Sequence, residues 1–239
     1  MLGSGNHFLE VCLDEADHVW VVLHSGSRGV DNRLASMHIN LAKAQEQALE
    51  DKNLAYFMEG TPEFTAYLDD MLGAQAYALE NRKLMMTAAL ADLFDFVGKG
   101  RELRRINRHH NFTAQEVHSG QRRWITRKGA IRDRKGDAGV IPGSMGTRSY
   151  IVEGLGNPDS YNSASHGAGR RMSRGQAKRD LSEESLTAMM DKIAWTRDAK
   201  SLLDEHPLAY KDIDQVMADQ EDLCRATHTL HQIVNYKGG

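Results

Sequence analysis

The sequence between Pro62 and Gly98 constrains the fold more than any other part of the chain. It is rich in Ala, Leu and Met, and it is bounded by a proline and a glycine, which favour the first turn and the C-cap of a helix. We therefore predict a helix from Glu63 to about Val97, with a break allowed near Gly73. Apolar residues at helical spacing predict another helix over 32–51, with Leu34, Met37, His38, Leu41, Ala44 and Ala48 on one face. The two stretches together predict a helical insert over about 32–98.

The rest of the sequence has the pattern of short strands. An apolar run ends at Leu23 and is followed by His24 and a turn rich in Gly and Ser. After Gly98, short strands with Gly-rich connections are predicted in "INRHHNFTAQEV", "QRRWITRKGAIRDR", "DAGVIPGSMGTRSYIVEG" and "NSASHGAGR". Short helices are predicted near Glu183–Ile193 and Asp214–Cys224, before a last strand in "LHQIVNYKGG". This order predicts an α+β protein with one main core, a mixed β core that carries the helical insert.

The composition excludes several classes of protein. The 239 residues are 41% hydrophobic and 26% charged with a formal net charge of −3, so any site for a polyanion must be a local patch. The two cysteines, Cys12 and Cys224, lie far apart, which argues against a disulfide framework. No apolar run approaches the roughly 18 residues of a membrane span. These features predict a soluble, cytoplasmic protein with no membrane partner.

Histidine occurs beside Gly, Ser or Asn in four separate segments. These are Asn6-His7, "HSGSRG" from His24, "HHN" from His109, and "SHGAGR" from Ser165. A histidine at a strand end beside a tight turn can present a ring nitrogen to a metal ion, so His7, His24 and His110 are candidate ligands for zinc, iron, nickel or manganese. No two of them have the spacing of a known metal motif. Solvated histidines in turns explain the same pattern equally well.

The segment "SHGAGR" predicts a phosphate site. Gly167 and Gly169 on either side of Ala168 would expose backbone N–H groups to a phosphate, and Arg170 would pair with it. His166 would then serve as an acid or base, or as a nucleophile that forms a phosphoramidate. A turn with an incidental histidine is the alternative. The segment "PGSMGTRS" predicts a related loop, whose hydroxyls from Ser144, Thr147 and Ser149 could bind a nucleotide.

A basic run follows the "HHN" segment. It interleaves Trp124 with seven cations: Arg122, Arg123, Arg127, Lys128, Arg132, Arg134 and Lys135. Such a run is typical of a surface that contacts a phosphate backbone. A solvated strand face is an equally good interpretation.

Taken in order, the segments "LGSGNHFLE", "HSGSRG", "HHNF", "PGSMGTRSY", "SHGAGR", "AYKDI" and "YKGG" closely resemble those of the RtcB-type RNA ligases, from residue 2 to the end of the chain. The resemblance implies an RtcB-type α+β fold and a ligase that uses GTP and two manganese ions. Such a ligase joins an RNA 3′-phosphate or 2′,3′-cyclic phosphate end to a 5′-hydroxyl end, in tRNA splicing or RNA repair. It implies RNA and GTP as partners.

The resemblance also assigns roles to residues of this chain. His166 would attack GTP and carry GMP, while His7, His24 and His110 would be the metal ligands. Asn6, Asn111 and Arg170 would hold phosphates. The guanosine would be contacted by Glu10, Ser144, Ser149, Tyr210 and Lys237, and residues 167–169 complete the predicted nucleotide site.

The sequence departs from the family pattern at its beginning. Family members carry, before this first motif, a segment with an Asp and a Cys that ligate the two metal ions. Cys12 lies after His7 instead, so we predict that it is an ordinary small apolar residue. An N-terminally truncated fold would leave an exposed apolar surface or sheet edge.

Three explanations are open: a fragment of a longer ligase, which we favour, a short homologue without catalysis, or a second polypeptide that supplies the missing ligands. The functional alternative is a homologue that binds GTP, GMP or RNA ends without ligating them. A metal-dependent phosphoesterase is a third hypothesis.

Overall fold

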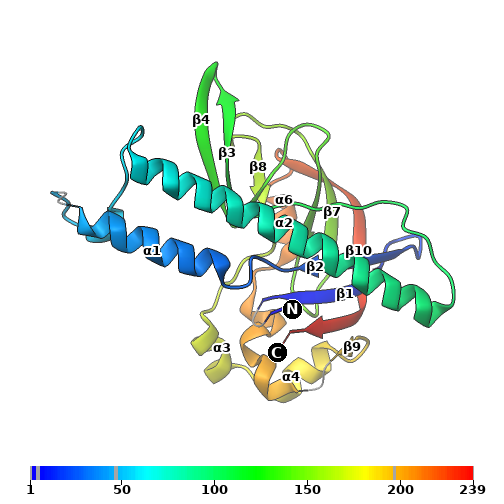
Figure 1. Ribbon diagram of the computed structural model, residues 1–239. Coiled ribbons are helices and arrows are strands. Elements are labelled where there is room, and N and C mark those ends of the chain that lie inside the picture. The colour runs from blue at the N-terminus through cyan, green and yellow to red at the C-terminus, as the bar shows by residue number, and fades with distance from the viewer. Residues whose placement is uncertain (1, 4–5, 46–47, 196–197, 239) are drawn as a thin grey trace.

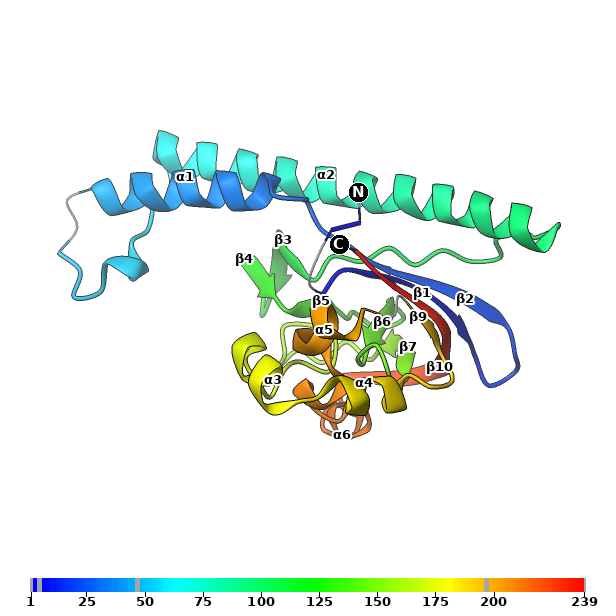
Figure 2. The same ribbon diagram turned by 90° about the horizontal axis from the view of Figure 1, so that it is seen from below.

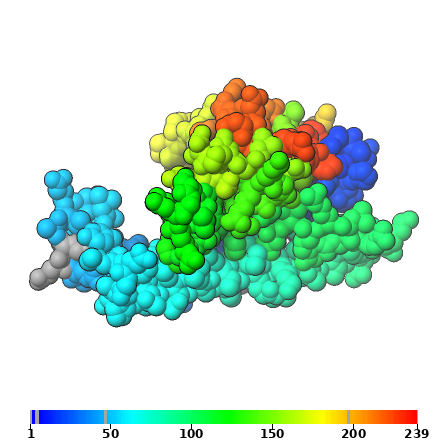
Figure 3. Space-filling view, turned by 90° about the horizontal axis from the view of Figure 1, so that it is seen from above, coloured from blue at the N-terminus to red at the C-terminus, as the bar shows by residue number. Residues whose placement is uncertain are grey.

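The computed structural model describes residues 2–3, 6–45, 48–195 and 198–238 (Figure 1). Two helices, α1 (Val30–Ala44) and α2 (Pro62–Val97), form a layer that runs along one side of the β-rich body (Figure 2). The space-filling view in Figure 3 shows this helical arm projecting beyond the body at the end where α1 and α2 are joined. The predicted helical insert is thus a separate layer of the fold.

Local sequence sets the ends of α2. The side chain of Thr61 accepts a hydrogen bond from the Phe64 amide at 3.3 Å, Pro62 occupies the first turn, and Gly98 takes a left-handed φ of 75° after the last turn. The helix continues through Gly73, so the allowed break does not occur. By contrast, α1 ends at Ala44, before the predicted Asp51, and a short 3₁₀ turn, η1 (Lys52–Leu54), lies beyond it.

Polar contacts hold the arm to itself and to the body. His38 of α1 contacts Asp70 of α2 through Nε2 at 2.8 Å. Arg82, a buried residue of α2, donates to the Asn107 side chain at 2.8 Å and to the carbonyl of Ser25 at 3.4 Å. The long helix is therefore fixed to the loop that follows a strand of the main sheet.

The main sheet has six strands in the order β2-β1-β10-β7-β6, with β9 paired to β10. Their bounds are β1 (Phe8–Leu13), β2 (Val19–His24), β6 (Ala138–Pro142), β7 (Ser149–Gly154), β9 (Ala194–Trp195) and β10 (Cys224–Lys237). All pairs are antiparallel except β9 with β10. The long strand β10 pairs with β7 through its first half and with β1 through its second half, so it joins the two halves of the sheet.

Two smaller strand pairs and several short helices complete the body. The strand pairs are β3 (Asn111–His118) with β4 (Gln121–Lys128), and β5 (Ala130–Arg132) with β8 (Ser163–Ser165). The helices are α3 (Arg174–Asp180), α4 (Glu183–Met189), α5 (Ala199–Leu202), α6 (Ile213–Ala218), η2 (Leu203–Glu205) and η3 (Pro207–Ala209).

The architecture confirms the predicted α+β class and corrects some boundaries. The helix predicted to end at Ile193 ends at Met189, and the one predicted to reach Cys224 ends at Ala218, because Cys224 begins β10. The helix α3 was not predicted.

The core lies between the main sheet and the elements that cover it. Cys12 has no exposed surface and packs with Phe8, Val22, Ile151 and Leu230, which confirms that it is a small apolar core residue. On β2 and β10 of the described sheet, some apolar side chains face solvent, including Val19, Val234 and Tyr236 at 60%, 39% and 52% exposure. None of the described helices has the length and apolar character needed to cross a lipid bilayer.

Candidate active site

Four histidines from four segments lie in a row at one end of the main sheet. His7 precedes β1, His24 ends β2, His110 precedes β3, and His166 follows β8. The ring centroids are 6.0 Å apart for His7 and His24, 4.6 Å for His24 and His110, and 5.2 Å for His110 and His166. The antiparallel register that places Phe8 opposite His24 explains the first pair. The structure thus brings together all four histidines that the sequence singled out.

His166 is held in one tautomer. Its Nδ1 lies 2.7 Å from the carbonyl oxygen of Gly129. Because a carbonyl only accepts hydrogen bonds, Nδ1 carries the proton and Nε2 keeps its lone pair. Burial and the charge of Lys128 lower the pKa of His166, against the opposing effect of this hydrogen bond, so the ring is neutral near pH 7. A neutral imidazole with an open lone pair is a nucleophile.

The pKa values of the other three histidines are lowered as well. Burial lowers the pKa of His110 to about 3, with a further contribution from His166, and burial holds the pKa of His24 well below its ordinary value. Burial, and after it the guanidinium of Arg28, lowers the pKa of His7. Neutral rings are the form that binds metals, so the donor set is right in kind for a divalent ion.

The geometry of the three proposed ligands fits a metal site less well than their residue type does. The Nη1 of Arg28 donates a hydrogen bond of 2.9 Å to Nδ1 of His7. The Nδ1 lone pair of His7 is therefore already used and is not available to a metal ion. Among the described residues, the group of three ligand atoms lying within 4.8 Å of one another is not this one but Asp14, Glu15 and His228. Metal binding by His7, His24 and His110 therefore requires His7 and Arg28 to move apart.

The Asp14, Glu15 and His228 group lies at the far end of the β1–β2 hairpin, away from the histidine row. The Asp14 carboxylate accepts from the amides of Ala16 and His18, both at 2.9 Å, and from Trp20 Nε1 at 3.0 Å. These bonds fix the hairpin turn, which is sufficient to explain a buried aspartate there. No sequence motif indicates this group, because His228 is over 200 residues from Asp14.

The "SHGAGR" loop differs from the predicted phosphate cradle. The amide of Ala168 donates to the carbonyl of Pro142 at 3.0 Å, so it is not directed at a ligand. A Cβ on Gly167 would lie 2.9 Å from the same carbonyl oxygen, which explains the glycine by close packing. Gly169 has a φ of 72°, and no atom beyond its chain neighbours lies within 4 Å of the position that a Cβ would take. The loop is shaped by the strand that it packs against, and its glycines position His166.

A buried carboxylate that the sequence analysis missed organises three of the predicted nucleotide residues. Glu205 is 1% exposed and accepts a hydrogen bond from the Tyr210 hydroxyl at 2.5 Å and from Lys237 Nζ at 3.4 Å. Arg170 lies 3.5 Å from its other oxygen, and the Arg170 guanidinium stacks on the Tyr210 ring at 4.9 Å. Arg174 contacts the same oxygen at 3.3 Å. No local sequence signal distinguishes Glu205 from an ordinary surface glutamate.

Glu10 is buried on the neighbouring strand pair. Its Oε1 accepts from Asn235 Nδ2 at 2.7 Å and from Gln232 Nε2 at 3.0 Å, while its Oε2 has no hydrogen-bond partner among the described residues. Burial raises the pKa of Glu10 to about 8, although both amides and Lys237 act in the opposite direction. An unpartnered buried oxygen is costly, so in the ionised form of Glu10 this atom is suited to a ligand with N–H donors.

The remaining predicted nucleotide residues fall around this group. Ser144 is buried and its carbonyl accepts from Gln232 at 2.9 Å, which ties it to Glu10. Ser149 begins β7 with no exposed surface and a hydroxyl that has no partner among the described residues. Asn6 is exposed in the turn before His7. Asn111 begins β3 and accepts from the Gly129 amide at 3.0 Å, on the residue that orients His166.

The basic run divides into buried and exposed parts. Arg127 is 3% exposed and makes a two-point contact with the buried Glu116 at 2.6 and 3.1 Å, so it belongs to the interior. Arg132 pairs with Asp137 at 3.3 Å. The cations with exposed side chains are Arg122, Arg123, Lys128, Arg134 and Lys135. The proposed phosphate surface is therefore smaller than the sequence suggested.

The described chain is thus an α+β protein with a row of neutral histidines beside two buried glutamates. Comparison with known proteins identifies its family. Residues 1–238 match the family model described as tRNA-splicing ligase RtcB, and the chain belongs to this family. It is 46% identical to the RNA-splicing ligase RtcB of Escherichia coli K12 over 99% of the chain and 60% of that protein.

More distant relatives give the same family. The chain is 33% identical to the RNA-splicing ligase RtcB of Mycobacterium tuberculosis, over 99% of the chain and 64% of the relative. It is 30% identical to the tRNA-splicing ligase RtcB of Nanoarchaeum equitans, over 96% and 55%. The chain spans about 60% of the length of the curated relatives it matches.

Proposed function

We propose that this chain carries the nucleotide-transfer part of a GTP-dependent RNA ligase, with His166 as the residue that accepts GMP. The observation that carries the proposal is the 2.7 Å contact of His166 Nδ1 with the Gly129 carbonyl. It leaves Nε2 unprotonated, while burial keeps the ring neutral near pH 7. The names of the relatives support an RNA substrate, and tRNA splicing or RNA repair is the proposed setting.

In the proposed reaction, Nε2 of His166 attacks the α-phosphorus of GTP. A P–N bond forms, the bond to the bridging oxygen breaks, and pyrophosphate leaves. The GMP then passes to the 3′-phosphate end of one RNA, and His166 recovers its lone pair. The 5′-hydroxyl of the second RNA then attacks the activated 3′-phosphorus. The new phosphodiester P–O bond forms, the P–O bond to GMP breaks, GMP leaves and the hydroxyl proton passes to solvent. The Gly129 carbonyl accepts the Nδ1–H hydrogen bond throughout, and the partial negative charge of its oxygen stabilises the positive charge that develops on the ring.

A divalent metal ion, manganese by the family resemblance, would neutralise phosphate charge in these steps. His7, His24 and His110 are proposed to hold it, and their lowered pKa values keep them available as donors. Manganese also favours oxygen ligands, which the three imidazoles do not provide. We propose that phosphate oxygens and an additional segment, from a longer form of this chain or from a second polypeptide, supply them.

The guanine is proposed to lie between Glu10 and the Glu205 group. Once Glu10 has lost its proton, its open Oε2 can accept from the N1–H and amino group of guanine. Lys237 and Tyr210 are held on the other side by Glu205. Asn6, Asn111 and Arg170 would contact phosphates, and Ser144 and Ser149 would contact the nucleoside. The whole chain would form one catalytic region of a cytoplasmic enzyme, with 32–98 as its helical insert.

The test is intact-protein mass spectrometry after incubation with GTP and manganese. We expect a mass gain of one GMP in the wild-type chain and none in His166→Ala. Because Arg28 donates a hydrogen bond to the proposed metal ligand His7, the same assay on Arg28→Gln is expected to show equal or greater labelling. Binding of GTP without labelling in any variant, in the presence of the additional segment that supplies the other metal ligands, would overturn the proposal in favour of a non-catalytic nucleotide-binding homologue.

A further inference from the structure

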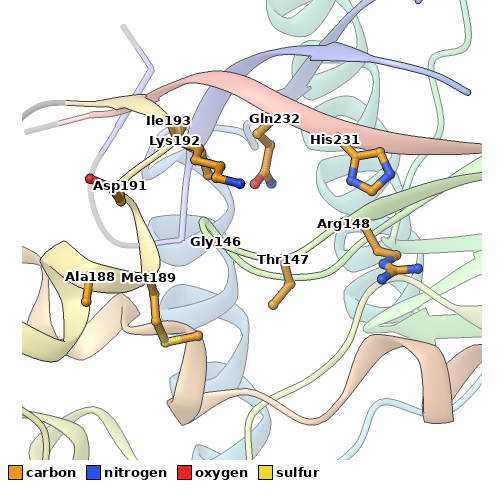
Figure 4. Close-up of a pocket in the computed structure, with 10 residues that line it drawn as sticks. All are labelled: Gly146, Thr147, Arg148, Ala188, Met189, Asp191, Lys192, Ile193, His231 and Gln232. Atoms are coloured by element: carbon orange, nitrogen blue, oxygen red, sulfur yellow. The ribbon is translucent and has the colours of Figure 1, made fainter.

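A cavity of about 410 Å³ opens where the long strand β10 changes neighbours. On one edge, β10 pairs with β7 up to Leu230 and with β9 from Val234, so the segment 231–233 lies at the gap between these two strands. The loop before β7, the end of α4 and the segment before β9 surround the gap (Figure 4). The cavity is therefore part of the sheet architecture and does not depend on one loop.

Basic side chains from three segments line this cavity. Arg148 comes from the loop before β7, Lys192 from the segment before β9, and His231 from β10. In Figure 4, the side chains of Lys192 and Gln232 extend into the same space, which is bounded on the other side by Arg148 and His231. The described lining includes one carboxylate, Asp191, whose side chain points away from the basic groups.

The charge in the cavity is only partly compensated by nearby residues. Arg148 Nε lies 3.6 Å from Oδ1 of Asp214, and that oxygen already accepts the hydroxyl of Tyr150 at 2.6 Å. The Arg148 side chain remains 45% exposed. Two cations and an imidazole thus lie around a space large enough for a phosphate group, whereas the Thr147 hydroxyl is engaged by the amide and hydroxyl of Ser144 at 2.7 and 3.0 Å.

We propose that this cavity is a second phosphate-binding site, separate from the histidine row. None of the residues proposed to contact guanosine is among the described residues that line it, and Gln232 forms the wall between the cavity and Glu10. The ligand is a phosphate group recognised by Arg148 and Lys192, with a hydrogen bond from His231. The phosphate comes either from an RNA backbone or from a free phosphate compound.

The experiment compares Lys192→Glu and Arg148→Glu with Lys99→Glu, which makes the same charge change at an exposed residue beyond α2. Two probes are used: a labelled short single-stranded RNA in fluorescence anisotropy, and pyrophosphate in calorimetry. For the probe that the cavity binds, we expect Kd to rise about tenfold in each cavity variant and to change less than twofold in the control. Because all three side chains are exposed, circular dichroism of each variant should match the wild type.

The two probes separate the sources of the phosphate. Weakened RNA binding identifies an RNA backbone, and the slope of log Kd against log salt concentration should then fall by about 0.7 for each phosphate that the variant no longer neutralises. Weakened pyrophosphate binding alone identifies a free phosphate compound. Equal affinities in cavity variants and control, for both probes, overturn the proposal. Neither assay requires transfer of GMP, so failure of the proposed ligase activity would leave these results unaffected.

Discussion

Glu10 and Glu205 are both fully buried glutamates, yet their surroundings are opposite in charge. Glu205 faces Lys237, Arg170 and Arg174 and accepts the Tyr210 hydroxyl. Glu10 has two neutral amides on one oxygen and nothing on the other among the described residues. The comparison shows that burial alone does not decide the role of a carboxylate: partners with charge make it a structural anchor, and neutral partners leave it available to a ligand.

The largest expected effect comes from removing the anchor. Glu205→Leu leaves the buried Lys237 and part of Arg170 without a counter-charge, so we expect a loss of about 3 kcal/mol in the free energy of unfolding. Urea denaturation measures it. Glu205→Gln, which still accepts the Tyr210 hydroxyl, is the matched control and should lose less. A loss below about 1 kcal/mol in the leucine variant would contradict this prediction, because it would show that Lys237 and Arg170 are hydrated when Glu205 is absent.

The second prediction concerns the pH dependence that Glu10 introduces. Its pKa rises from an ordinary 4.5 to about 8 on folding, so between these values the folded state holds a proton that the unfolded state has lost. The contribution of Glu10 is therefore full below pH 4.5 and is lost as the pH rises toward 8. In Glu10→Gln this loss disappears, so the stability of the variant relative to wild type should increase from pH 5 to pH 8. Denaturation at several pH values tests this, and parallel curves would contradict it.

The smallest effect is expected at Lys237, which lies between the two glutamates. Lys237 lowers the pKa of Glu10 and also pairs with Glu205 at 3.4 Å. Lys237→Met should therefore move the pH at which wild-type stability falls to a higher value, by less than Glu10→Gln changes the profile. The same denaturation series measures the shift. An unchanged midpoint of the pH-dependent stability change would mean that the charge of Lys237 does not affect the titration of Glu10.

The sequence predicted those features that depend on neighbours along the chain. Pro62 and Gly98 bound the long helix because they act locally, and the strand before His24 follows from its apolar run. The row of four histidines was accessible only as a set of candidates, because the register of β1 with β2 and the contact with Gly129 bring them together. Residue types therefore indicated the site, and tertiary pairing assembled it.

Other features could not be predicted because no local pattern carries them. Glu205 is defined by cations from α3, β10 and the loop after β8, and Arg127 is buried by a partner on the adjacent strand. Gly167 is predicted to contact a phosphate, and the close approach of the Pro142 carbonyl is a packing reason for this glycine that the sequence does not show. In each case the decisive partner is distant in sequence or belongs to the backbone, which a motif does not show.

The place of β10 in the sheet has a consequence for the order of folding. β10 lies between β1 and β7, and its bond from Asn235 to Glu10 closes a loop of 225 residues. The β1–β2 and β6–β7 hairpins can form early, but they stay unjoined until this strand inserts, and closing so long a loop is slow. A nascent chain that ends before residue 224 would therefore expose two unpaired strand edges, making it a natural client for a chaperone.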